Sequence, residues 1–407
     1  MRMNNTHENN NIIENNTEMN SNVKDTPKHT KRKGKGSKCS RKRILLTILA
    51  SILVLIILAV ILIPKLLFTD YEGLPTTGPY EVAQTSAILI DDNRIEAFET
   101  DGSNREVPVY FYYPVMEAGE EESCPLIIFS HGAFGYYQSN ASTYMELASH
   151  GYVVVSLDHP YHSFFTTDTT GKTITVNPEF IQDVMRVNEE DITEEEIIAL
   201  SHSWLELRLA DMNFVLDTIK EAKTDGDLAT SNWYVTDETV ASDILTILSG
   251  TDTETIGLMG HSLGGASSVT LGRTRGDVDA VIDLDGTMLG EELSYENGTY
   301  KFYEEEYPIP LLSLSNEEHH LEGEAVGNLY VNNVVLANAK DSHYTYFVGS
   351  GHMNFTDLPL FSPPLASMLG VGEADATECI VTMNEIVLSY YDYYLKGEGE
   401  FILQESY

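Results

Sequence analysis

The sequence predicts an α/β fold built on a mostly parallel sheet that is covered by helices on both faces. Short apolar runs bounded by turn residues predict strands at 107–113, 126–130, 152–158, 255–259, 280–283, 310–315 and 344–348. Helical periodicity runs through 201–223 and 379–395, and the second stretch stops before Gly397. Nearly continuous apolar strands that alternate with helices are typical of a parallel sheet buried on both sides.

An uncharged apolar run precedes this fold. It begins at Ile44 and ends at Ile63, and as a helix its 20 residues would reach about 30 Å, the thickness of a bilayer's hydrocarbon core. A buried core helix would keep a polar stripe, and this run has none. A cleaved signal peptide has a shorter apolar region that ends at a small-x-small site. We therefore predict one uncleaved transmembrane helix, acting as a signal anchor.

Charge is distributed unevenly about the apolar run. Residues 1–43 carry 11 Lys and Arg against 4 Asp and Glu, whereas the chain from Lys65 onward carries 13 against 59. Because basic segments stay on the cytoplasmic side, we expect a single-pass protein of the cell membrane with a cytoplasmic N-terminus and an extracytoplasmic body. The acidic body would repel phosphates, which argues against a nucleic-acid partner.

Composition divides the chain into four parts. Residues 1–43 are Asn-rich and then basic, with no apolar period, so we predict a disordered cytoplasmic tail. The anchor at 44–63 follows, and then a linker rich in Gly, Pro and Thr at 64–80. A single α/β domain should occupy 81–407. Its segment 163–254 is long for one crossover, and we expect part of it to form a cap over the site.

The motif Gly260-His261-Ser262-Leu263-Gly264 directly follows a predicted strand and opens an apolar helix. The bare pattern G-x-S-x-G is weak, but its place in a strand-to-helix turn is far more specific. Flanking glycines remove Cβ clashes in so sharp a turn, which lifts the serine hydroxyl clear of the sheet. A serine in an ordinary tight turn is the alternative. We predict that Ser262 is a nucleophile.

A serine hydroxyl attacks only after a base takes its proton. Ligands of parallel sheets bind beyond the carboxyl ends of the strands, so the base should follow a later strand. His352 follows the last predicted strand in a loop of small residues. His319 and His320 follow the strand before it, among glutamates that we expect to face solvent, and His343 precedes its strand. We predict His352 as the base, with His320 as the weaker alternative.

An acid should orient that imidazole and balance its charge. Asp285 stands where the strand 280–283 ends, 23 residues after Ser262. Asp283 is nearer the strand interior, where burial without a partner would be costly. A turn-forming role is the structural alternative for either aspartate. We predict Asp285 as the acid.

The developing oxyanion needs two backbone donors. One should be the N–H of Leu263, just after the nucleophile. The other should come from the turn 131–135 that follows the strand 126–130, and Ala133 is the expected donor. We expect His131 to brace this turn rather than to act in catalysis.

These motifs, in their order and spacing over about residues 75–400, resemble the platelet-activating factor acetylhydrolases and related bacterial esterases. The resemblance is carried by Gly78-Pro79-Tyr80, Ser130-His-Gly-Ala-Phe-Gly135, Asp158-His159, Gly260-His-Ser-Leu-Gly-Gly265, Leu284-Asp285 and the loop at His352. It implies an α/β-hydrolase fold and hydrolysis of short-chain or oxidised acyl esters, including platelet-activating factor-like phospholipids, with no cofactor and no metal. The implied triad is Ser262, Asp285 and His352, with oxyanion donors Ala133 and Leu263.

Other functions remain open. A peptidase or a polyester-degrading esterase can use the same triad, and a non-catalytic surface binding domain can share the fold. A silent domain would be expected to have lost triad members, whereas every predicted position here is occupied. We therefore expect a carboxylic ester hydrolase that acts through an acyl-enzyme on Ser262.

Overall fold

The computed structural model describes residues 62–63, 65–116, 123–187, 189–228 and 232–407. The α/β fold lies in the unit Ile63–Tyr407. The predicted tail and nearly all of the predicted anchor at 44–63 fall outside the described residues. Within the described ranges, no helix has the length and apolar character needed to cross a bilayer.

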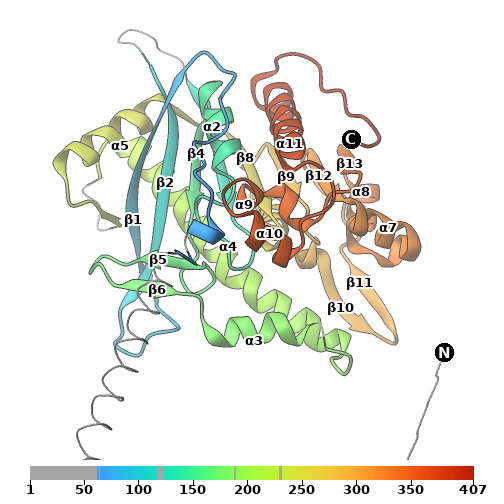
Figure 1. Ribbon diagram of the computed structural model, residues 1–407. Helices are drawn as coiled ribbons and strands as arrows, with labels where there is room; N and C mark the ends of the chain where they lie inside the picture. The colour runs from blue at the N-terminus through green and yellow to red at the C-terminus, as the bar shows by residue number, and fades with distance from the viewer. Residues whose placement is uncertain (1–61, 64, 117–122, 188, 229–231) are drawn as a thin grey trace, which may run out of the picture. The chain divides into compact units, whose positions relative to one another are not determined.

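A nine-stranded sheet forms the centre of the unit Ile63–Tyr407 (Figure 1), with the strand order β13-β12-β9-β8-β3-β4-β2-β1-β7. Pairing is parallel from β13 to β4 and antiparallel from β4 to β7. The strands are β1 (Glu81–Ile95), β2 (Asn104–Val115), β3 (Cys124–Ser130), β4 (Val153–Leu157), β7 (Trp233–Tyr234), β8 (Thr251–His261), β9 (Ala280–Leu284), β12 (Leu311–Asn316) and β13 (Ser342–Phe347). Every residue of β3, β4, β9 and β12 is buried, which favours the apolar residues that make up most of these strands. Two of their polar side chains, Asp283 and Ser313, are hydrogen-bonded to each other.

The register of the parallel strands brings the ends of five strands together at the carboxyl-terminal end of the sheet. Ser130 at the end of β3 pairs with Gly260 of β8, and Gly260 pairs with Asp283 of β9. The ends of β12 and β13 continue the same edge, with Asn316 opposite Phe347. Because parallel strands present their carboxyl ends together, the residues that follow these strands meet along this edge.

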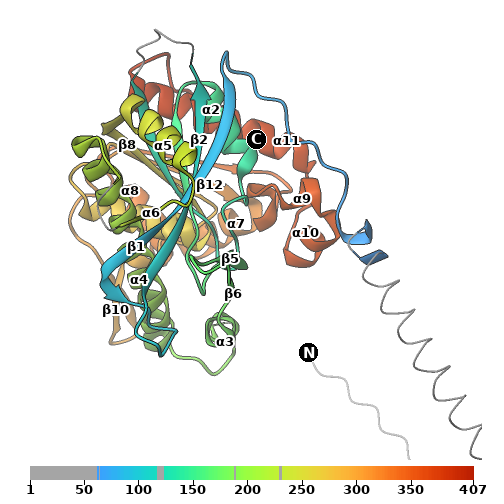
Figure 2. The same cartoon turned by 90° about the vertical axis from the view of Figure 1, so that its left-hand side faces the viewer.

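Helices cover both faces of the sheet, as predicted. One face packs against α4 (Glu194–Asp225), α5 (Glu238–Gly250), α6 (Leu263–Thr274) and α8 (Val331–Asn338). The other face packs against α2 (Ala141–Ser149) and α11 (Ala376–Tyr391), which ends in a π turn at Asp392–Lys396. Figure 2 shows α5, α6 and α8 on the opposite side of the sheet from α11.

The remaining elements are two small hairpins and several short helices. Two small hairpins pair β5 with β6 and β10 with β11. Their bounds and those of the remaining helices are β5 (Phe165–Thr167), β6 (Thr173–Thr175), α3 (Pro178–Arg186), β10 (Glu292–Glu296), β11 (Thr299–Phe302), α7 (Glu317–Val326), α9 (Leu358–Phe361) and α10 (Pro363–Leu369).

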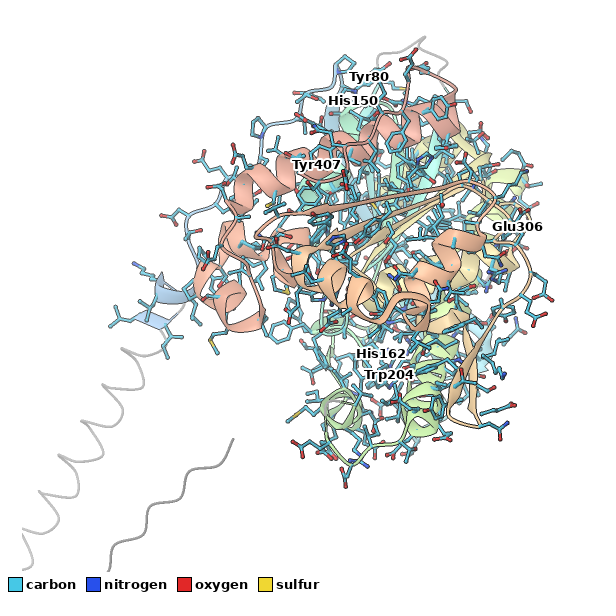
Figure 3. The ribbon with its side chains drawn as sticks, turned by 90° about the vertical axis from the view of Figure 1, so that its right-hand side faces the viewer. Tyr80, His150, His162, Trp204, Glu306 and Tyr407 are labelled. Atoms are coloured by element: carbon cyan, nitrogen blue, oxygen red, sulfur yellow. The ribbon has the colours of Figure 1, made fainter. Side chains whose placement is uncertain are left out.

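The segment 163–254 contains the β5–β6 hairpin, α3, the crossover helix α4, β7 and α5. Phe180 of α3 and Trp204 of α4 pack edge to face, with ring centroids 5.6 Å apart, and Phe180 also stacks on His162. Figure 3 shows His162 and Trp204 close together at this end of the molecule. Phe180 and Trp204 form an apolar cluster with Leu263 and Ala266 at the start of α6.

Two strands at the edge of the sheet were not predicted. β1 is 15 residues long, but only three of its residues are buried, so it lacks the apolar run of the central strands. β7 has two residues and pairs only with β1. Edge strands of this kind leave a weak signal, because solvent on one side relaxes the demand for apolar residues.

Candidate active site

Ser262 lies in the turn between β8 and α6, with a left-handed backbone conformation of φ 56° and ψ −123°. A positive φ is costly for any residue with a side chain and persists where the surrounding structure enforces it. A Cβ at Gly260 would collide with the backbone of Gly264, and a Cβ at Gly264 would collide with Ser130 O. The two glycines of the motif therefore allow β8, α6 and the end of β3 to meet around Ser262.

The turn that follows β3 lies directly against the serine. A Cβ at Gly132 would stand 3.2 Å from Ser262 Cβ and 2.8 Å from His261 Nδ1, tighter than side chains normally allow. His131 Nδ1 donates to Gly132 O at 2.7 Å, so this histidine braces the turn. Burial and the charge of Arg208 hold the pKa of His131 well below its usual value, which keeps the ring neutral.

The two backbone N–H groups predicted to bind the oxyanion belong to Leu263 and Ala133. Leu263 is the first residue of α6, so its N–H has no acceptor within the helix. The N–H of Ala133 makes no hydrogen bond to any of the residues that the structure describes. Both predicted donors thus lie in the two turns that meet at Ser262.

Asp285 follows β9, fully buried and with a positive φ of 55°. Its Oδ2 accepts a hydrogen bond of 2.6 Å from His352 Nδ1, and Asn316 Nδ2 donates to the same oxygen at 2.6 Å. Oδ1 accepts from Asn316 N at 2.7 Å and from His319 Nδ1 at 3.0 Å. Burial alone would raise the pKa of Asp285, but the hydrogen bonds and charges of the two histidines outweigh it and hold that pKa below its usual range.

His352 opens a short 3₁₀ turn after β13, and its side chain is 33% exposed. Its ring centroid lies 4.5 Å from that of His261, the neighbour of Ser262, and His261 Nε2 donates to His352 O at 3.2 Å. Among the described residues, neither Ser262 Oγ nor His352 Nε2 has a hydrogen-bond partner. Such catalytic hydrogen bonds are often long without substrate and tighten in the reacting complex.

His319 does not face solvent as we expected from its glutamate neighbours. Asn316 caps the N-terminus of α7, and this cap turns His319 inward onto Asp285. Burial disfavours its charged form, but the hydrogen bond to Asp285 outweighs burial and raises the pKa of His319. His320 points elsewhere: it stacks on Tyr346 and bonds to the hydroxyl of Tyr344.

Asp283 makes no hydrogen bond to the histidines around Asp285, although it is only two residues away along the chain. Its carboxyl group is fully buried and accepts hydrogen bonds from Gly286 N at 3.0 Å and Ser313 Oγ at 3.1 Å. Burial, together with the charge of Asp285, raises its pKa well above the usual value. Among the described residues its hydrogen-bond partners are Gly286 and Ser313, and neither is a histidine, in contrast to the partners of Asp285.

Asp285, His319 and His352 also form the group of described residues that could ligate a metal, with ligand atoms all within 4.8 Å of one another. Each imidazole donates an Nδ1–H to the Asp285 carboxylate, which holds the three side chains together by hydrogen bonds alone. We therefore assign no metal to this group.

Sequence analysis missed several residues that shape the site. Asn316 donates two hydrogen bonds to Asp285. Its position at the end of a predicted strand was the sequence signal that could have identified it. Arg208 reaches the turn after β3 from the middle of α4 and donates to Gly132 O at 3.2 Å. A charged residue within the apolar stripe of a helix was the signal for Arg208.

Comparison with known proteins agrees with this architecture. The family described as platelet-activating factor acetylhydrolase, isoform II, matches residues 80–405. A solved structure of a ferulic acid esterase from Streptomyces cinnamoneus superimposes with a TM-score of 0.59 at 19% sequence identity, covering 82% of this chain and 95% of that one. At this identity the superposition shows the α/β-hydrolase fold alone. The family match spans most of the sequence, and the chain therefore belongs to the platelet-activating factor acetylhydrolase isoform II family of ester hydrolases.

Proposed function

We propose that the protein is a serine esterase that hydrolyses short-chain or oxidised acyl esters, including platelet-activating factor-like phospholipids, through an acyl-enzyme on Ser262. The observation that carries this proposal is the meeting of three strand ends at one sheet edge. Ser262 follows β8 in a strained turn, and the Asp285–His352 pair joins the ends of β9 and β13 through a 2.6 Å hydrogen bond.

In this mechanism His352 Nε2 takes the proton of Ser262 Oγ while the oxygen attacks the ester carbonyl. Asp285 holds the proton on Nδ1, so that Nε2 is the basic nitrogen, and it stabilises the imidazolium that forms. The N–H groups of Ala133 and Leu263 stabilise the negative oxygen of the tetrahedral intermediate. His352 then gives its proton to the leaving alcohol, and water releases the acid by the reverse sequence.

A preference for short acyl groups is supported by the packing around the two oxyanion donors. Phe180, Trp204 and Leu263 are buried together there, and Ala133 and Phe134 pack against them. A long acyl chain entering from this side would have to displace aromatic side chains that are already packed. An acetyl or short oxidised chain requires much less space.

The proposal predicts a fall in turnover with acyl length. The enzyme should hydrolyse p-nitrophenyl acetate and butyrate at least about tenfold faster than the dodecanoate in kcat/KM, about 1.4 kcal/mol in transition-state stabilisation. A phosphocholine lipid with a 2-acetyl group should likewise be preferred over its 2-palmitoyl counterpart. Equal turnover of long and short esters would remove the acyl preference, and cleavage of peptides without cleavage of esters would identify a peptidase.

We further propose that the run 44–63 anchors the enzyme in the cell membrane with the catalytic domain outside. The support is the length and apolar character of the run, and the change from a basic to an acidic chain across it. With an epitope tag at each end, protease added to intact cells should remove the C-terminal tag and spare the N-terminal one. The opposite pattern would reverse the orientation, and survival of both tags only in a soluble fraction would contradict an anchor.

A further inference from the structure

The carbonyl oxygen of the peptide bond between Gly132 and Ala133 accepts hydrogen bonds from three donors. Gly132 O accepts from His131 Nδ1 at 2.7 Å, from Gly135 N at 3.1 Å and from Arg208 Nη2 at 3.2 Å. The other side of the same planar unit is the Ala133 N–H. In a trans peptide the carbonyl oxygen and the amide hydrogen point in opposite directions, so fixing the oxygen also fixes where the N–H points.

Arg208 is buried without an ion pair to any described residue. Its side chain is fully buried in the stripe of α4 that packs on the sheet, yet among the described residues no carboxylate lies within ion-pair distance of it. Its guanidinium donates instead to His131 O and to Gly132 O, and more weakly to Ser130 Oγ at 3.3 Å. Burial lowers the pKa of Arg208 only to about 9, so the group still carries its charge at neutral pH.

Asp211, one helical turn further along α4, would be the natural partner of Arg208 but is engaged elsewhere. It forms an ion pair with Arg105 at 2.7 Å and accepts from His159 Nδ1 at 2.9 Å. The other nitrogen of His159 contacts Ser130 Oγ at 2.9 Å. Arg208 and Asp211 therefore reach the region at the end of β3 separately. Asp211 contacts it through His159 and Ser130, whereas Arg208 contacts the turn directly.

A buried cation that forms no direct ion pair is costly to fold. Hydrogen bonds to a carbonyl oxygen polarise its amide, which makes the N–H of the same unit a stronger donor. The positive charge of Arg208 near the Gly132 carbonyl also favours a negative charge near the Ala133 N–H. Both effects act on the Ala133 N–H, which belongs to the residue after Gly132, where an added Cβ would stand 3.2 Å from Ser262 Cβ.

We propose that Arg208 and His131 are positioning residues that aim and polarise the Gly132–Ala133 peptide, so that the Ala133 N–H stabilises the oxyanion formed on attack by Ser262. The proposal rests on the function proposed above. His131 acts here through its Nδ1–H, because Gly132 O can only accept a hydrogen bond. Both side chains act through the carbonyl oxygen of this peptide rather than by contact with the substrate.

The test compares an ester with the matching thionoester, in which sulfur replaces the carbonyl oxygen. Sulfur accepts hydrogen bonds weakly, so damage to an oxyanion donor lowers the ester rate more than the thionoester rate. In the full-length enzyme, Arg208→Met should lower kcat for the ester by about 10- to 100-fold with little change in KM, and should lower the ester-to-thionoester ratio of kcat/KM by about tenfold. A purely structural role would lower both substrates equally.

His131 offers a matched pair of variants in case Arg208→Met does not fold. The amide of asparagine can place an N–H near the position of Nδ1, whereas that of glutamine lies nearer Nε2 and cannot reach Gly132 O. His131→Gln should therefore lower the ester-to-thionoester ratio, and His131→Asn should restore most of it at similar thermal stability.

An unchanged ratio in both Arg208→Met and His131→Gln, with Ser262→Ala inactive, would overturn this inference and leave the proposed function intact. Equal ratios in His131→Gln and His131→Asn, or equal loss on both substrates, would also overturn it. An enzyme that is inactive before mutation, or still active as Ser262→Ala, would instead overturn the proposed function.

Discussion

Replacing Ser262 by alanine should abolish ester hydrolysis, with a loss of about 10⁴–10⁶ in turnover. The hydroxyl supplies the attacking oxygen, and no neighbouring residue can replace it at the strained turn between β8 and α6. Thermal stability should be nearly unchanged, because alanine adopts the positive φ of this position about as well as serine does. Stopped assays with p-nitrophenyl acetate and labelling with a fluorophosphonate measure the effect directly.

Ser268 provides a matched control on the same helix. It is buried, and its hydroxyl donates to Gly264 O one turn earlier, so Ser268→Ala removes a hydroxyl close to the site without touching the proposed nucleophile. This variant should keep its fluorophosphonate labelling and its turnover. If Ser262→Ala still hydrolyses esters or still takes the label, the nucleophile lies elsewhere.

Replacing Asp285 by asparagine should lower turnover by about 10³–10⁴. The amide cannot stabilise an imidazolium. If its Nδ2 took the place of Oδ2, it would face the donors Asn316 Nδ2 and His352 Nδ1, and His352 would turn the wrong nitrogen toward Ser262. If it took the place of Oδ1, it would face the donors Asn316 N and His319 Nδ1. The measurement is kcat for a p-nitrophenyl ester, with the melting temperature recorded in parallel. Combined with Ser262→Ala, the change should add almost nothing, because the groups act as a unit.

Asp283→Asn is the matched control, with the same substitution in a buried carboxyl two residues away. Its raised pKa means that the folded state prefers the protonated carboxyl, so ionisation opposes folding as the pH rises above the unfolded pKa of the group. An amide imitates the protonated acid, accepting from Gly286 N and donating to Ser313 Oγ. Asp283→Asn should therefore stay active and be at least as stable at neutral pH. An inactive, well-folded Asp283→Asn would refute our assignment of the acid.

His319→Ala separates the two imidazoles that share Asp285. Because His352 lies beside His261 and the serine turn, we expect His319→Ala to retain most of the activity and His352→Ala to lose it. Loss of activity in His319→Ala alone would make His319 the base.

The sequence by itself determined the features that depend on local pattern. Short, mainly apolar runs identified the central strands, since burial on both faces favours apolar side chains. The glycines around Ser262 identified the sharp turn, because a side chain at either position would collide with the neighbouring backbone. The ends of predicted strands also selected Asp285 and His352, since parallel strands deliver such residues to a common edge. The structure places these two side chains in contact.

Only the tertiary structure decided which distant residues surround these elements. Asn316 and His319 meet Asp285 because β12 lies between β9 and β13, an order that no local pattern encodes. Arg208 reaches the turn after β3 across 76 residues of chain, and it stays unpaired because Asp211 is held by Arg105. The protonation state and the hydrogen-bond partners of a buried polar group depend on residues that packing brings close to it. Sequence periodicity shows only that a position faces the interior, so it cannot predict those partners.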